Sequence, residues 1–305
     1  MEHMELNGGC KKSRVLIIGA SGFLGKELYK TFKADAENYE TYGTYAQNTL
    51  PYCEHLDITA VESVKSIFQK YHPNIVIITA ALTNVDYCEV NKEEAYKINV
   101  IGIRHIAEQC KLYGCTAVYV SSEYVFDGNN GPYDENSVPL PINYYGESKL
   151  AAEKIVIKEL DKYLIARTTV VYGWDTESKN FMMQLIRNLS NNKAMKVPID
   201  QISSPTYCPN LANMIKESCD LNLVGVYNMV GGDVIDRYSF AAKAAKILNL
   251  NPNLVLPVET KTLGQVAKRP LRAGLKADKI AALLKNQPLS VVEGCKEIKK
   301  YLADK

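Results

Sequence analysis

The chain has 305 residues, 47% of them hydrophobic and 23% charged, so it can bury a large core, and we expect one large domain with a smaller lobe. Its formal net charge of +2 comes from 36 basic and 34 acidic residues spread along the sequence, a balance that predicts neither a nucleic-acid partner nor binding to a membrane surface. No apolar run approaches the roughly 20 residues that cross a bilayer.

The eight cysteines are scattered, without a CxxC pair or a neighbouring histidine cluster. We therefore predict no metal site and no disulfide framework. Unpaired thiols of this kind suit a reducing cytoplasm. Residues 1–13 contain no hydrophobic segment of the secretory kind, and we expect them to form a flexible leader.

From Arg14 onward, short apolar runs alternate with amphipathic stretches, the pattern of a parallel sheet covered by helices on both faces. The strands are expected in RVLIIG, YETYGTYA, PNIVIITAA, TAVYVSS and KYLIARTTVVYG. The helices are expected over Phe23–Ala34, in AVESVKSIFQKY and NKEEAYKINVIGIRHIAEQCKLYG, and from about Tyr145. We predict an α/β fold with a doubly wound parallel sheet of the Rossmann type, which forms an NAD(P)-binding domain over residues 14–173.

After Gly173 the regular alternation ends, and helical and extended segments follow in irregular order. We predict that residues 174–305 form mainly a smaller, mixed substrate-binding lobe. A segment near 205–228 is expected to return to the first domain.

The stretch IIGASGFLGKEL places three glycines between a buried strand and a helix. Glycine at these positions permits a tight turn and a close approach to a pyrophosphate, which the helix N-terminus can bind. We expect the cofactor to be lined here by Gly19, Ser21, Gly22, Phe23, Leu24 and Gly25. The spacing GxxGxxG is typical of short-chain dehydrogenases.

The end of the second strand, GTYAQNT, offers neither an acid for a ribose 2′-hydroxyl nor an arginine for a 2′-phosphate. NADPH and NADH therefore both remain open as the cofactor. Asp57, with Ile58 beside it, is a candidate for binding the adenine. The alternative is that Asp57 is only a turn residue before a helix that Thr59 caps.

Tyr145 and Lys149 are one helical turn apart and share a face, whereas Tyr144 points about 100° away. Tyr145 is therefore the candidate proton donor, and we expect the nearby ammonium to bring the pKa of its phenol toward the working range. Ser122 ends the preceding strand, at the sheet edge where ligands of doubly wound folds lie. The glycine loop, the strand-end serine and YxxxK together predict an oxidoreductase.

The chain resembles the extended short-chain dehydrogenases, and among them the dTDP-4-dehydrorhamnose reductase family. The resemblance spans Val15 to about Leu275 and is carried by GASGFLG, TAALTNVDYCE, INVIG, SSEYVFDG, YGESKLAAE, ARTTVVYG, DQISSPTY and KRPLRAGL. It implies a cytoplasmic enzyme of dTDP-rhamnose biosynthesis that uses NADPH or NADH to reduce the C4 ketone of a nucleotide-linked 4-keto-6-deoxy sugar. Ser122, Tyr145 and Lys149 would be its catalytic residues.

Further positions follow from the same resemblance. On the cofactor side it implies Ala80 and Ala81, with Thr83 at the border with the sugar, and Asn99, Arg167 and Thr168 as support. On the substrate side it implies Val85, Asp86, Glu123, Tyr124, Val170 and Gln201. Val170 is a departure, because the family usually has tryptophan there and the only tryptophan of this chain is Trp174.

Two alternatives stay open. The regulatory β-subunit of methionine adenosyltransferase resembles the same family, has a similar YVFDG string and lacks the family tryptophan; it binds NADP but acts as a partner protein. An epimerase or dehydratase of the same superfamily would return its cofactor to the starting redox state. The sequence leaves the sugar, the nucleotide and the oligomeric state open, with a homodimer as one option.

Overall fold

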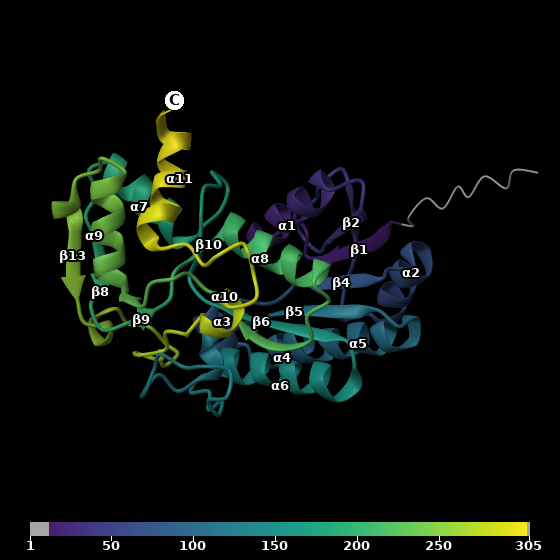
Figure 1. The fold of residues 1–305 in the computed structure, drawn as a ribbon. Helices are drawn as coiled ribbons and strands as arrows, with labels where there is room; N and C mark the ends of the chain where they lie inside the picture. Colours follow the sequence, from purple (N-terminus) through teal and green to yellow (C-terminus); the bar gives the residue numbers. More distant parts are fainter. Residues whose placement is uncertain (1–11, 304–305) are drawn as a thin grey trace, which may run out of the picture.

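A seven-stranded parallel sheet forms the centre of the computed structural model, which describes residues 12–303 (Figure 1). Its strand order is β11-β6-β5-β4-β1-β2-β3. The strands are β1 (Ser13–Ile18), β2 (Tyr39–Tyr45), β3 (Cys53–His55), β4 (Ile75–Ile78), β5 (Thr116–Ser122), β6 (Tyr163–Thr168) and β11 (Gly225–Asn228). The predicted doubly wound α/β fold is confirmed. Residues 1–11 of the predicted leader lie outside the described residues, and Ser13 already belongs to β1.

Helices cover both faces of the sheet, which explains why its central strands lack polar alternation. One face packs against α2 (Val61–Tyr71), α5 (Gly102–Tyr113) and α6 (Tyr144–Glu159). The other packs against α1 (Phe23–Ala34) and α8 (Cys208–Asp220), which lie above the sheet in Figure 1. The first helix has the predicted bounds.

The single helix expected after Asn91 is interrupted. It consists of α4 (Lys92–Tyr96), a π-helical turn (Lys97–Ile101) and α5, and it is preceded by an unpredicted short helix, α3 (Val85–Val90). The buried Asn99 lies in the π turn, where its side chain accepts a hydrogen bond from the Leu82 N–H at 2.8 Å and donates to the Leu82 carbonyl at 3.0 Å. A side-chain clamp on a distant loop cannot be read from helical periodicity.

The remaining helices and strands build a smaller lobe, at the left of Figure 1. Its core lies between α7 (Phe181–Ser190), α9 (Arg237–Ile247) and α11 (Val291–Ala303). The strands beside these helices form three short pairs: β8 (Met195–Pro198) with β13 (Val255–Val258), β9 (Ile202–Ser203) with β12 (Ile235–Asp236), and β7 (Val171–Tyr172) with β10 (Thr206–Tyr207). Single turns of 3-10 helix occur at Glu123–Val125, Pro252–Leu254 and Thr260–Thr262.

The chain returns from the lobe to the sheet through α8 and β11. The strand β11 pairs with β6 in parallel, from Gly225 beside Leu164 to Asn228 beside Arg167. The short helix α10 (Asp278–Ala281) also packs here through the buried Ile280. Helix α8 and strand β11 lie within the segment expected to return.

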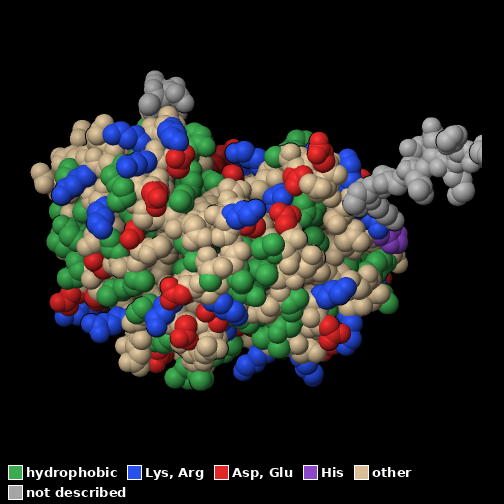
Figure 2. Space-filling model, viewed as in Figure 1, with side chains coloured by type: hydrophobic (Ala, Val, Ile, Leu, Met, Phe, Trp, Pro, Cys, Tyr) green, Lys and Arg blue, Asp and Glu red, His purple; other side chains and the backbone are tan. Residues whose placement is uncertain are grey.

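Charged side chains of both signs are interspersed over the visible face of the molecule (Figure 2). This agrees with the nearly balanced composition. None of the described helices is long and apolar enough to cross a membrane.

Candidate active site

The glycine loop between β1 and α1 is a tight backbone cradle. Gly19 has a φ of +91°, and a Cβ there would lie 2.8 Å from the backbone nitrogen of Ala80. A Cβ on Gly25 would lie 2.1 Å from the Gly19 carbonyl oxygen. Helix α1 begins at Phe23 without a side-chain cap and without an acid in its first turn. Its N-terminal N–H groups thus fit a pyrophosphate.

The other residues assigned to the cofactor side fall into two groups. Ser21, Phe23 and Leu24 lie in or directly after the loop and are partly buried. Ala80, Ala81 and the exposed Thr83 follow the end of β4, the strand next to β1. Both groups lie at the carboxyl ends of neighbouring strands.

Asp57 and Ile58 have local partners. The Oδ1 atom of Asp57 accepts hydrogen bonds from the Thr59 N–H at 2.8 Å and from the Thr59 hydroxyl at 2.7 Å. The side chain of Ile58 is buried against Gly102 of α5. This geometry is that of a turn residue, although the suggested Thr59 cap is wrong: the N-cap of α2 is Ala60, without a side-chain hydrogen bond.

Several buried polar atoms without a hydrogen-bond partner lie on β5 and β6 or directly after β5. Among the described residues, those on or directly after these two strands are Tyr119 OH, Ser121 Oγ, Glu123 Oε2, Arg167 Nη1 and Thr168 Oγ1. Buried polar groups normally have partners, so this cluster indicates a place where a polar ligand completes the hydrogen bonding. A dinucleotide with its sugar substrate fits such a set.

Tyr145 lies on the first turn of α6, which Asn143 caps by accepting a hydrogen bond from the Gly146 N–H at 2.9 Å. The Tyr145 ring is 9% exposed and meets the Tyr124 ring edge-on, with centroids 5.6 Å apart. Burial raises the pKa of the phenol, and a hydrogen bond with the Ser122 side chain opposes that rise. The structure thus brings Ser122 and Tyr145 together across the end of β5.

One electrostatic expectation is wrong. Burial is the largest influence on Tyr145 and raises the pKa of its phenol above the ordinary value, where we had expected the neighbouring ammonium to lower it. The reason is the direction of Lys149, whose Nζ donates to the Val120 carbonyl at 2.7 Å and lies 4.2 Å from the centre of the Tyr119 ring. Burial lowers the pKa of Lys149 to about 7, against the opposing field of Glu153.

Glu123 and Tyr124 follow Ser122 directly; Glu123 is buried and Tyr124 is partly buried. Burial raises the pKa of Glu123 to about 8, although a hydrogen bond with Thr169 and the charge of Arg237 both lower it. At neutral pH this carboxyl therefore holds its proton for most of the time. A neutral carboxylic acid can donate a hydrogen bond beside the Ser122 hydroxyl.

The Val85–Asp86 segment is held by a loop from the lobe. Val85 packs in the apolar cluster around Tyr145. The carboxylate of Asp86 accepts from the Ala267 N–H at 2.9 Å and pairs with Arg269 at 2.9 Å. The side chain of Asn143 also donates to the Lys268 carbonyl at 2.8 Å. Residues 268–270, here called the KRP segment, thus contact the N-terminus of α6.

Val170, at the place of the family tryptophan, has a strained backbone. Its φ is +40°, a left-handed conformation that is a genuine outlier for a β-branched residue. Such strain persists only where the surroundings enforce it, and it is common at functional sites. Here the Val170 carbonyl accepts a hydrogen bond from the Thr206 N–H at 3.2 Å, at the junction of the sheet domain and the lobe.

We expect Val170→Gly to be more stable than Val170→Ala by about 1 kcal/mol in urea unfolding. Both variants remove the same isopropyl group, but only glycine relieves the positive φ. This reverses the usual order of the two residues, since glycine ordinarily costs chain entropy. Equal stability, or a more stable alanine variant, would mean that position 170 is not strained.

Gln201 lies in the lobe and is 8% exposed. Its side-chain amide donates to Thr260 Oγ1 and to Gln265 Oε1, both at 3.0 Å. Residues next to it open onto a cleft of about 900 Å³. The charged residues lining the cleft are Asp127, Asp200, Lys261, Lys268, Arg269 and Arg272.

The family model described as "RmlD substrate binding domain" matches residues 13–303. The chain belongs to this family. The RmlD-family chain is 32% identical to a dTDP-4-dehydrorhamnose reductase of Aggregatibacter actinomycetemcomitans, over 95% of this chain and 99% of that protein. The predicted family is therefore confirmed.

Two further relatives bear on its function. A crystal structure of dTDP-4-dehydrorhamnose reductase from Bacillus anthracis in complex with NADP is 35% identical, with a TM-score of 0.88, and the match covers 95% of this chain and 100% of that one. The β-subunit of methionine adenosyltransferase 2 from Xenopus tropicalis is 30% identical, over 88% of this chain and 81% of its own length. These two reductases match over more of both chains than this β-subunit does.

Two further residues of the RmlD-family chain act on the site and were not predicted from the sequence. Arg237, at the start of α9, and Arg269 of the KRP segment both act electrostatically on Tyr124. They come from the lobe and are separated from Tyr124 by more than 100 positions. The RP pair was a visible signal for Arg269, whereas nothing in the sequence distinguishes Arg237 from other helix arginines.

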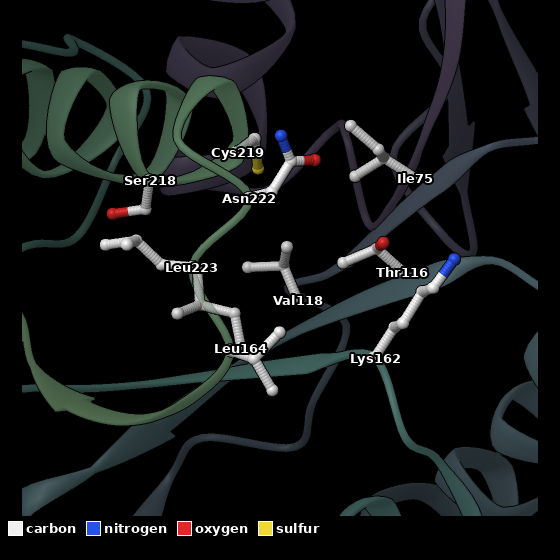
Figure 3. A pocket seen from close by; sticks show the side chains of 10 residues that line it. Ile75, Thr116, Val118, Lys162, Leu164, Ser218, Cys219, Asn222 and Leu223 are labelled. Carbon is white, nitrogen blue, oxygen red and sulfur yellow. The ribbon is translucent and has the colours of Figure 1, made fainter.

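A smaller cavity of about 170 Å³ lies at the opposite edge of the sheet. Its wall includes Ile75 and Thr116, the first residues of β4 and β5. Figure 3 shows Val118, Leu164 and Leu223 facing one another across it. Ligands of doubly wound folds lie outside the carboxyl ends of the strands, so this cavity at the amino ends is not the cofactor site.

Proposed function

We propose that the protein is an NAD(P)H-dependent reductase acting on the C4 ketone of a nucleotide-linked 4-keto-6-deoxy sugar, with Ser122, Tyr145 and Lys149 as catalytic residues. The observation that carries the proposal is the contact between Ser122 and Tyr145 at the end of β5. Only β4 lies between β5 and β1, the strand that leads into the glycine loop. The similarity to dTDP-4-dehydrorhamnose reductases at 32% and 35% identity supports it.

The protein's own groups would handle the proton. Tyr145 would donate its phenolic proton to the ketone oxygen as charge develops there, and Ser122 would hydrogen-bond the same oxygen. The high pKa of the buried phenol keeps that proton in place until an oxyanion forms beside it. A group of this kind typically contributes ~10² to 10⁴ in rate.

The cofactor would be held by the glycine loop, with Lys149 on a ribose hydroxyl. When bound, NADPH or NADH supplies the hydride. The residues between the end of β2 and Glu54 include neither an acid nor an arginine, so the proposal leaves both cofactors admissible.

The nucleotide diphosphate is proposed to occupy the cleft of about 900 Å³ beside Gln201. Four cationic side chains line that cleft against two carboxylates. The excess of positive charge suits a diphosphate. Its position next to the KRP segment, which contacts Asn143 of the α6 cap, would put the attached sugar near Tyr145.

We expect Lys268→Gln and Arg272→Gln each to raise the KM for the sugar nucleotide about 2- to 5-fold, with kcat nearly unchanged. Both side chains are exposed, so the effect should shrink as the salt concentration rises. Lys296→Gln, on the outside of α11, is the matched control. If the control raises KM as much as the cleft variants do, the diphosphate does not bind in this cleft.

The direct test mixes the purified protein with dTDP-4-dehydrorhamnose and either NADPH or NADH. Stoichiometric oxidation of the cofactor, with a reduced sugar as product, is the expected result. An unchanged cofactor with a rearranged sugar would indicate an epimerase or dehydratase. A panel of other 4-keto sugar nucleotides would then identify the preferred substrate.

A second candidate is a non-catalytic regulatory subunit, favoured by Val170 in place of the family tryptophan and by the 30% identity to the methionine adenosyltransferase β-subunit. It predicts cofactor binding without turnover and co-elution with a methionine adenosyltransferase. Co-elution without any cofactor oxidation would replace the reductase proposal.

We also propose a cytoplasmic location, which agrees with the seven cysteines of the described residues, all free. A homodimer is the proposed assembly. Light scattering on the purified protein measures the assembly directly, and a monomer mass would reject it.

A further inference from the structure

One face of α6 carries a third functional group beyond Tyr145 and Lys149. Glu153 follows Lys149 by four residues and lies on the same face. Its carboxylate is 1% exposed and accepts two hydrogen bonds from Arg167, at 3.0 Å from Nε and 2.7 Å from Nη2. The pair is therefore a buried, bidentate salt bridge.

Arg167 connects this face to the strand that carries Ser122. It lies on β6 directly beside Ser121 of β5, one residue from the pairing of Thr168 with Ser122. Its guanidinium is 5.2 Å from the centre of the Phe126 ring, and its backbone carbonyl accepts from the Met229 N–H at 2.8 Å. Arg167 is thus fixed from three sides.

A buried salt bridge needs a reason other than stability. The desolvation of two charges commonly equals or exceeds their mutual attraction, and well-packed apolar residues are often as stable. This pair lies under Lys149, which has no carboxylate hydrogen-bonded to it among the described residues. The one acid whose field acts on Lys149 there is Glu153.

We propose that Glu153 and Arg167 are positioning residues for the reductase reaction: Glu153 supplies the negative charge that favours the ammonium form of Lys149, and Arg167 holds that carboxylate in place. The inference rests on the proposed function for its catalytic meaning. Its physical content, a charge coupling between Glu153 and Lys149, does not depend on the substrate.

The burial of Lys149 makes its protonation sensitive to the charge of Glu153. The titratable and charged groups around it are Tyr145 and Glu153 on α6, Tyr119 on β5 and, behind Glu153, Arg167 on β6. Burial pulls the pKa of Lys149 down to about 7, and Glu153 alone opposes this. Without that carboxylate, Lys149 would be largely neutral at neutral pH, and its neighbours would lose an ammonium.

The test compares Glu153→Gln with the double variant Glu153→Gln/Arg167→Met. The double variant matters because glutamine alone leaves a buried unpaired guanidinium, which can prevent folding. Lysines labelled with ¹³C at the ε carbon are titrated by NMR in the cofactor-free protein, and Lys149→Met identifies the resonance. We expect the Lys149 midpoint to fall by roughly one pH unit in Glu153→Gln, and by less in the double variant, which also removes the positive charge of Arg167.

The pH profile of kcat is the second readout. Its limb assigned to Lys149 should move in the same direction as the NMR midpoint. An unchanged midpoint in a folded double variant would overturn the proposal and leave a purely structural salt bridge. Inactivity of the wild-type protein toward every sugar nucleotide, with the midpoint shifted as expected, would instead reject the proposed function and keep the coupling.

Discussion

Tyr145→Phe is expected to lower kcat by ~10² to 10⁴ while the affinity for the cofactor stays close to wild type. The substitution removes only the phenolic oxygen and its proton, which lie beside Ser122 at the end of β5. It leaves the ring in the apolar cluster with Cys88 and Ala95. Ser122 can still hydrogen-bond the ketone oxygen, but no phenol is left to donate a proton to that oxygen. Stopped-flow oxidation of NADPH with saturating sugar nucleotide measures the loss, and fluorescence titration measures cofactor binding.

Tyr144→Phe is the matched control, since it makes the same chemical change one residue earlier. The Tyr144 ring is only half-buried, and the Lys92 ammonium lies 5.2 Å from its centre, outside the Ser122–Tyr145 contact. We expect kcat to remain within about twofold of wild type. Full activity in the Tyr145 variant, or equal losses in both, would remove Tyr145 from the mechanism.

The sheet domain was predictable because local signals and topology agree there. The apolar runs that became β1 and β4 lack alternation since both faces are covered, and the glycine loop marks the turn into α1. The lobe was not predictable in detail. Several of its strands have only two residues and are defined by distant partners, as with Ile202 and Asp236. Such pairs leave no periodicity to detect.

The candidate site likewise contains residues that the sequence predicts and residues that it does not. Ser122, Tyr145 and Lys149 carry a recognisable spacing, and the structure brings the first two together. The groups that surround them belong to segments that are distant in the sequence: Arg269 lies in the KRP segment and Arg237 lies at the start of α9. Their closeness to Tyr124 depends on how the lobe packs against the sheet domain, and sequence spacing contains no information about that packing.

Burial is the physical factor that sequence spacing omits. Two neighbouring residues on a helix suggest that an ammonium lowers the pKa of a phenol, but this holds only if the ammonium points at it. In the folded chain Lys149 points at the Val120 carbonyl, and burial raises the pKa of Tyr145. The effect of one charge on another therefore has to be read from the side-chain directions.

Gly25→Ala is expected to weaken cofactor binding by about 10- to 100-fold, which corresponds to roughly 1.4 to 2.8 kcal/mol of binding free energy. The new methyl carbon would lie 2.1 Å from the Gly19 carbonyl oxygen and 2.8 Å from the Ala20 Cα, and both atoms belong to the backbone. Because no side chain can move aside, the loop itself must shift away from α1. Isothermal titration with NADPH and with NADH measures the loss.

Gly22→Ala serves as the folding control for this loop. Gly22 has an extended φ of −74°, and its nearest obstacle is the Gly19 carbonyl oxygen at 3.3 Å, so alanine requires a shift of only a few tenths of an ångström. We expect its free energy of unfolding to stay within about 0.5 kcal/mol of wild type, while Gly25→Ala loses about 1 to 3 kcal/mol. If Gly25→Ala folds and binds the cofactor as tightly as wild type, the pyrophosphate does not rest on this loop, because a displaced backbone could not present the same N–H groups to it.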